Sequence, residues 1–255
     1  MNTTSQSSNA LPNAGTPRFA PLPESAMTEA QVKAARELAS GPRGKMSGSG
    51  PNIVLLRSPE LLSHTQKVGA YLRYSSALPA RLNEFAICIT ARQWNANVEW
   101  MAHHPLALKA GLNPAVAEDL AQGKRPATMK DDEAAIYQFC TELHQTKNVS
   151  DPTYKAVFDM FGERAVVELI ALTGYYTMLA MVLNVAQQPL AGGVPPSSAM
   201  ALDEIIAPAP ITPPASSRAI PPNNVLRCMT LPFRSLRRSE LLLAWSASMT
   251  EWNHG

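Results

Sequence analysis

Residues 79–108 read PARLNEFAICITARQWNANVEWMAHHPLAL, and this stretch decides the fold. In its first half the apolar side chains recur every three or four residues, which places them on one face of an α-helix over 79–91. Helical spacing continues from Val98 to Leu108, and Pro105 bends or restarts the segment there. The stretch therefore predicts two successive amphipathic helices. The apolar positions of the first are Leu82, Phe85, Ala86, Ile89 and Thr90.

Helix signals continue toward the N-terminus. Thr28-Glu-Ala-Gln31 is a capping-box pattern, which opens a helix that reaches about Ser40 before Gly41-Pro42. Ser58-Pro59 begins a second helix that reaches about residue 71. Between these two helices, SGSGP at 47–51 indicates a flexible break.

Toward the C-terminus, capping residues and prolines mark further helices in the same way. The expected starts are at Asn113-Pro114, at Thr128 for a helix over 129–147, at Ser150-Asp-Pro152, and just after Gly162 for a last helix over 163–187. Nothing in this middle region alternates like a strand. We therefore expect an all-α fold, a helical bundle.

Proline placement sets the domain boundaries. Of the 22 prolines in 255 residues, five fall in 60–188 and ten in 189–232. Proline breaks helix interiors, so we expect a disordered arm over 1–27, a helical domain over 28–195 and a poorly ordered tail over 196–255. The tail carries Arg234, Arg237 and Arg238 beside leucines, which is typical either of an incidental extension or of an amphipathic helix for a membrane or a partner.

Charge and composition exclude several classes. With 22 basic and 20 acidic residues the net charge is +2, which provides no electrostatic footprint for nucleic acid. The three cysteines are far apart and odd in number, so we expect neither a disulfide framework nor a cysteine metal site, and a cytoplasmic location. We also expect no bound metal and no cofactor. Residues 165–186 are long and apolar enough to span a bilayer. Glu168 within them favours a buried helix or an oligomer interface over a membrane span.

The two helices of 79–108 carry the candidate chemistry. Glu99 and His103 are four residues apart, so they lie on one helix face, where a carboxylate prepares an imidazole as an acid or base. Glu84 and Arg92 lie two turns apart on the preceding helix. In a hairpin these four side chains could meet in one pocket, with Trp100 as a wall. The pocket would combine an anion anchor, an acid–base group and two carboxylates.

The residues from Glu84 to His103, with Glu99-Trp-Met-Ala-His103 and the following Ala107-Leu-Lys-Ala-Gly111, resemble the carboxymuconolactone decarboxylase family. That family includes the alkylhydroperoxidase D-like proteins, and the resemblance is strongest to the branch with an E-W-x-x-H signature. It covers about 28–195. It implies an all-helical bundle that self-associates as trimers or hexamers and acts on a small-molecule substrate.

The resemblance also assigns roles. Ala96 and Glu99 stand where the alkylhydroperoxidase branch has the two cysteines of C-x-x-C, so thiol-dependent peroxide reduction by that motif is disfavoured. Decarboxylation of a small lactone or carboxylic acid needs no thiol. The implied roles are proton donor and acceptor for His103, its orientation for Glu99, a second acid–base group for Glu84, and a carboxylate anchor for Arg92.

Other interpretations remain open from the sequence. Glu84, Glu99 and His103 could hold a divalent ion. Arg92 could instead form a structural ion pair with Glu84 or Glu99. The domain could be a non-catalytic oligomeric module, or a residual peroxidase that uses Cys88 or an outside reductant.

Overall fold

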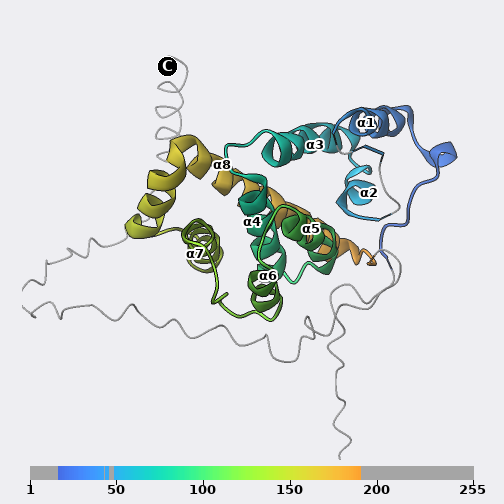
Figure 1. Ribbon diagram of the computed structural model, residues 1–255. Coiled ribbons are helices and arrows are strands. Elements are labelled where there is room, and N and C mark those ends of the chain that lie inside the picture. Colours follow the sequence, from blue (N-terminus) through green and yellow to red (C-terminus); the bar gives the residue numbers. More distant parts are fainter. Residues whose placement is uncertain (1–16, 43, 46–48, 191–255) are drawn as a thin grey trace, which may run out of the picture. The chain divides into compact units, whose positions relative to one another are not determined.

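The computed structural model describes residues 17–42, 44–45 and 49–190. The chain divides into two compact units, 1–208 and 209–255, and every described residue belongs to the first. Within the described residues the regular structure is entirely helical, with no strand (Figure 1). The expected all-α class is confirmed.

The described helices follow one another with short connections. They are the short 3-10 helix η1 (Glu24–Ala26) and the α-helices α1 (Glu29–Ser40), α2 (Pro51–Leu55), α3 (Pro59–Tyr74), α4 (Ala80–Gln93), α5 (Asn97–Lys109), α6 (Pro114–Ala121), α7 (Asp131–Thr146) and α8 (Asp151–Ala186).

Helix α4 lies at the centre of the described bundle, with α5, α7 and α8 packed around it (Figure 1). Every residue from Leu82 to Arg92 is buried. A helix buried on all sides needs apolar residues on all sides, and Phe85, Ile87 and Ile89 meet this need. Burial of each such side chain contributes about 1.5–3 kcal/mol to folding, so this helix anchors the core.

Several expected helix boundaries are confirmed. The Thr28 hydroxyl accepts from the Gln31 N–H, and the Gln31 side chain accepts from the Thr28 N–H, as the capping box predicted. Asn113 caps α6 by accepting from the Ala115 N–H. Gly162 has the non-helical angles φ 80° and ψ 173°, so the expected break separates two helical segments of α8 at a kink.

Three other expectations need correction. Pro51, expected within a flexible break, begins α2; residues 47–48 of that break lie outside the described residues. Helix α7 begins at Asp131 and not after Thr128, because the Glu133 carboxylate accepts from the Lys130 N–H and caps the helix there. Helix α5 continues through Pro105 without ending.

The N-terminal arm is partly attached to the bundle. The Arg18 N–H donates to the Ala186 carbonyl at 2.9 Å, and the Gln188 side chain donates to the Phe19 carbonyl at 3.1 Å. Expected disorder therefore does not hold for this part of the arm, because the last carbonyl of α8 and the Gln188 side chain just after the helix pair with it. Residues 1–16 of the arm and the whole expected tail over 196–255 lie outside the described residues.

Helix α8 has the length and composition of a membrane span, and 56% of its most apolar window is buried inside the bundle. A core helix of a soluble protein passes the same test, so this is weak evidence for a membrane. Glu168 within α8 accepts from the Tyr71 hydroxyl, the Ala77 N–H and the Arg164 guanidinium. These bonds satisfy its carboxylate and tie α8 to the end of α3.

Candidate functional site

The turn between α4 and α5 brings the candidate residues together. Asn95 in this turn adopts a left-handed conformation with φ 48°, and the Ala96 N–H donates to the Ala91 carbonyl at 2.8 Å. The tight turn folds the two helices against each other. His103 on α5 thereby meets Glu84 on α4, as the expected hairpin required.

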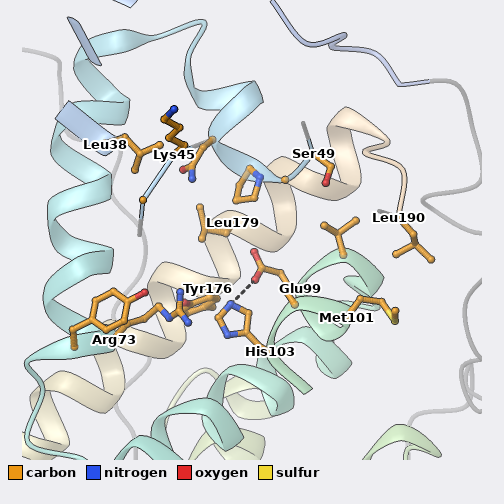
Figure 2. Close-up of a pocket in the computed structure, with 17 residues that line it drawn as sticks. Leu38, Lys45, Ser49, Arg73, Glu99, Met101, His103, Tyr176, Leu179 and Leu190 are labelled. Carbon is orange, nitrogen blue, oxygen red and sulfur yellow. Dashed lines mark ion pairs between the residues drawn. The ribbon is translucent and has the colours of Figure 1, made fainter. Parts of the chain in front are cut away.

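The His103 imidazole lies between two carboxylates. Its Nδ1 is 2.6 Å from Glu84 Oε2. Its Nε2 is 3.4 Å from Glu99 Oε2, the ion pair that is dashed in Figure 2. All three side chains are buried. A hydrogen bond at Nδ1 fixes the orientation of the ring and leaves Nε2 for proton exchange. The arrangement is that of a general acid or base held by a carboxylate, although it is Glu84 that makes the shorter contact, whereas the sequence assigned the orienting role to Glu99.

Arg73 completes this group from the last turn of α3. Its Nη2 is 3.3 Å from Glu84 Oε1, so Glu84 links the guanidinium to the imidazole. Burial by itself would raise the pKa of Glu84, but the hydrogen bond and charge of His103, followed by the charge of Arg73, hold that pKa below its ordinary value. Burial alone would lower the pKa of Arg73, and the neighbouring Tyr176 and Glu84 raise it instead. Glu84 is thus a carboxylate and Arg73 a cation.

The sequence argument missed Arg73. The sequence feature that could have identified Arg73 is the short connection between α3 and α4. A short connection places the end of one helix beside the start of the next. Arg73 lies one residue before the end of α3 at Tyr74, and Glu84 lies in the second turn of α4. Helix periodicity within either segment carries no information about such a pair.

Arg92 does not join the other three residues, which corrects its expected role as carboxylate anchor. Its Nε donates to the Ala121 carbonyl at 3.1 Å and its Nη1 to Asn95 Oδ1 at 2.6 Å. Eight residues on a helix amount to more than two full turns, so Arg92 points toward α6 and not along the Glu84 side. These contacts also exclude the alternative that Arg92 forms an ion pair with Glu84 or Glu99. Its guanidinium stabilises the C-terminal end of α6.

Trp100 does not form the expected wall of the pocket. It is buried in the hydrophobic core and stacks on His104, with ring centroids 5.1 Å apart. Glu99 and His103 share one face of α5, and Trp100 at the next position after Glu99 is rotated away from them by about 100°. Trp100 is therefore a packing residue.

A cavity of about 480 Å³ opens beside His103. Apolar and polar side chains from α1, α2, α3, α5 and α8 line it, together with residues of the connection before α2 (Figure 2). The polar lining groups are Lys45, Ser49, Asn52, Arg73, Glu99, His103 and Tyr176. The Tyr176 ring meets the His103 ring edge-on, with centroids 5.0 Å apart. Glu84 is behind this lining, in contact with both Arg73 and His103.

The described cysteines are outside this lining and buried. Burial raises the pKa of the Cys88 thiol, as do the neighbouring Glu84 and Glu99 charges, and burial raises the pKa of Cys140 to about 12. Such thiols are protonated at neutral pH and react slowly. Neither is suited to peroxide chemistry. Cys228 lies outside the described residues.

The two carboxylates do not face a common point, because each meets a different nitrogen of one imidazole. A metal ion would require the lone pairs to converge. Among the described residues, no group of three or more histidine, cysteine, aspartate or glutamate side chains has an arrangement that could hold a metal.

No protein-family model matches the chain, and no curated protein matches it either. What the site can do therefore follows from its geometry.

Proposed function

We propose that this protein is a carboxymuconolactone decarboxylase-like enzyme, which acts on a small lactone acid or other carboxylic acid by His/Glu acid–base chemistry. The observation that carries the proposal is the buried imidazole of His103 at the cavity wall, held between Glu84 and Glu99. Arg73 supplies the cation that an anionic substrate needs. The E-W-x-x-H signature supports the same reaction class.

The proposed reaction needs no external reactant. The bond between the substrate carbon and its carboxylate breaks, CO₂ leaves, and the electron pair enters the conjugated lactone carbonyl. The His103 Nε2–H then returns a proton to carbon and regains one from solvent. Glu84 holds Nδ1 and balances the charge of the protonated ring. Arg73 binds an anionic oxygen that stays with the substrate, because a cation held on the departing carboxylate would oppose its loss.

The test is CO₂ release from 4-carboxymuconolactone and related lactone acids by the purified protein. We expect His103→Ala to lower turnover at least a hundredfold, the size of a general acid–base contribution. His104→Ala is the matched control, because it removes the neighbouring imidazole on α5 that stacks on Trp100 instead of lining the cavity. Equal loss in both variants, or full turnover in His103→Ala, contradicts the proposal.

We also propose that the protein works in the cytoplasm and self-associates as a trimer or hexamer. Large apolar side chains are exposed along the outer face of α8, at positions with the spacing of a helix–helix seam. They are Val167, Ile170, Met181 and Val185. Light scattering after size-exclusion chromatography tests this, with the double variant Ile170→Glu/Val185→Glu expected to shift the mass to one protomer. A wild-type protein of one-protomer mass contradicts it.

A further inference from the structure

We propose that the ligand of this cavity is an amphipathic anion, in which the charged group is carried on an apolar body that is larger than the reacting group; this inference rests on the proposed function of the same cavity. The expected small lactone acid meets the charged part of the lining. The apolar part of the lining requires an apolar body on the ligand.

Among the described residues, Lys45 and Arg73 are the cations that line the cavity, and Arg73 is the one joined to Glu84 and, through Glu84, to His103. Its Nη2 contacts Glu84, while its Nε is buried without a hydrogen-bond partner among the described residues. A buried N–H without a partner costs free energy unless a ligand supplies the acceptor. The guanidinium is held over the Tyr74 ring, with Cζ 5.1 Å from the ring centroid. Arg73 is therefore a fixed cation with donor capacity at the cavity wall.

The end of the cavity opposite Arg73 carries large apolar side chains. In Figure 2, Arg73 and Tyr176 lie on one side, Met101 and Leu190 on the other, and His103 and Glu99 between them. Val98 and Ala102 add apolar lining from α5, and Leu179 adds it from α8, whereas Leu38 lies on the side of Arg73. A ligand that binds Arg73 and reaches the apolar end must therefore pass His103.

Helix α5 contributes both polar and apolar side chains to the cavity lining. Glu99 and His103 form one row along it, and Val98 and Ala102 form the adjacent row, each pair one turn apart. Both rows line the cavity. An apolar body lying along the second row keeps its head group against the first.

The size of the cavity leaves room for more than a carboxylate. A volume of about 480 Å³ lies within the range of about 300–1,000 Å³ that is usual for small-molecule pockets. A single carboxylate fills only a small part of it. Water beside the apolar lining gains few hydrogen bonds, so its displacement by methylene groups favours binding.

The test is a calorimetric binding series with the full-length protein. The probes are butanoate, hexanoate and octanoate, each with the primary amide of equal length as an uncharged control. We expect affinity to rise about fourfold for each added methylene, the usual gain for burying such a group. We expect each carboxylate to bind at least tenfold more tightly than its amide.

Variants at the two ends separate the two contributions. Arg73→Gln removes the preference for carboxylate over amide, and Arg73→Lys retains it in part. Val98→Thr/Met101→Gln lowers the gain per methylene to below twofold at nearly constant side-chain size. Met160→Gln is the matched control, because Met160 is an equally exposed methionine outside the cavity lining and should leave the series unchanged.

The outcomes distinguish this inference from the proposed function. A flat series, or a carboxylate preference that survives in Arg73→Gln, overturns the inference even if lactone acids are decarboxylated. A rising series that responds to the variants upholds it, even if no CO₂ is released. In that last case the proposed reaction fails, and the cavity is still a site for amphipathic anions.

Discussion

Glu84 of α4 and His103 of α5 are separated by 19 residues and joined by a contact of 2.6 Å between Oε2 and Nδ1. The same Glu84 carboxylate meets Arg73 through its other oxygen, and the other nitrogen of His103 faces Glu99. Three helices thus contribute to one chain of contacts that runs from Arg73 through Glu84 and His103 to Glu99. The position of the imidazole at the cavity depends on this chain, so its members should affect stability as well as turnover.

The Glu84 carboxylate should make stability fall in acid. Its folded-state pKa lies below the ordinary value of 4.5, so the unfolded chain takes up a proton at a higher pH than the folded protein does. The stabilisation is therefore complete above about pH 4.5 and is lost as the pH falls through the lower folded-state pKa. Urea unfolding midpoints from pH 6 to pH 3 measure this loss, which we expect to be smaller in Glu84→Gln than in the wild type.

Glu163→Gln is the control for that comparison, because Glu163 is exposed on α8. Its acid profile should match that of the wild type. The role assigned to the Glu84 pair is refuted if Glu84→Gln and Glu163→Gln have the same profile.

Glu168 should contribute more to stability than an exposed carboxylate on the same helix. Glu168→Ala leaves the Tyr71 hydroxyl and the Ala77 N–H without their acceptor, which costs about 2–3 kcal/mol of unfolding free energy. Asp159→Ala removes the exposed partner of Lys155 at the same i,i+4 spacing, and such pairs contribute at most about 0.5 kcal/mol. Urea unfolding of both variants measures the two losses of unfolding free energy. Equal losses would mean that the Glu168 cluster does not tie α8 to α3.

Alanine substitution should act in opposite directions at two glycines of α8. Gly162 has φ 80°, where alanine is strained, so Gly162→Ala should lower stability by about 1 kcal/mol or more. Gly174 is helical, and a Cβ there would meet nothing within 4 Å, so Gly174→Ala should raise stability by about 0.5–1 kcal/mol. Thermal unfolding measures both. A gain at Gly162 would contradict the kink.

Cys88 and Cys140 should resist thiol reagents in the folded protein. Both are fully buried and their thiols are held protonated. In a Cys228→Ser background, an aromatic disulfide reagent should label less than a tenth of the thiols before unfolding and both after it. Rapid labelling of native Cys88 would reopen the peroxidase interpretation.

Much of the fold could be predicted from local signals. The Thr28 capping box, the Asn113 cap and the Gly162 break depend on contacts within a few residues, so their sequence patterns sufficed. The start of α7 was misplaced because two capping signals lay close together, and the Glu133 carboxylate prevailed over Thr128. Helix α2 was missed because five residues carry too little periodicity to be recognised.

By itself, the sequence determined that the described part is all-helical and that Glu99 and His103 share a helix face, because both properties follow from the 3.6-residue period. It also indicated that Glu84 would meet them across a hairpin. Only the tertiary structure decided which cation joins them. Arg73 reaches Glu84 from another helix, while Arg92 on the same helix as Glu84 turns toward α6. The reason is physical: periodicity fixes directions within one helix, whereas contacts between helices depend on how their cores pack.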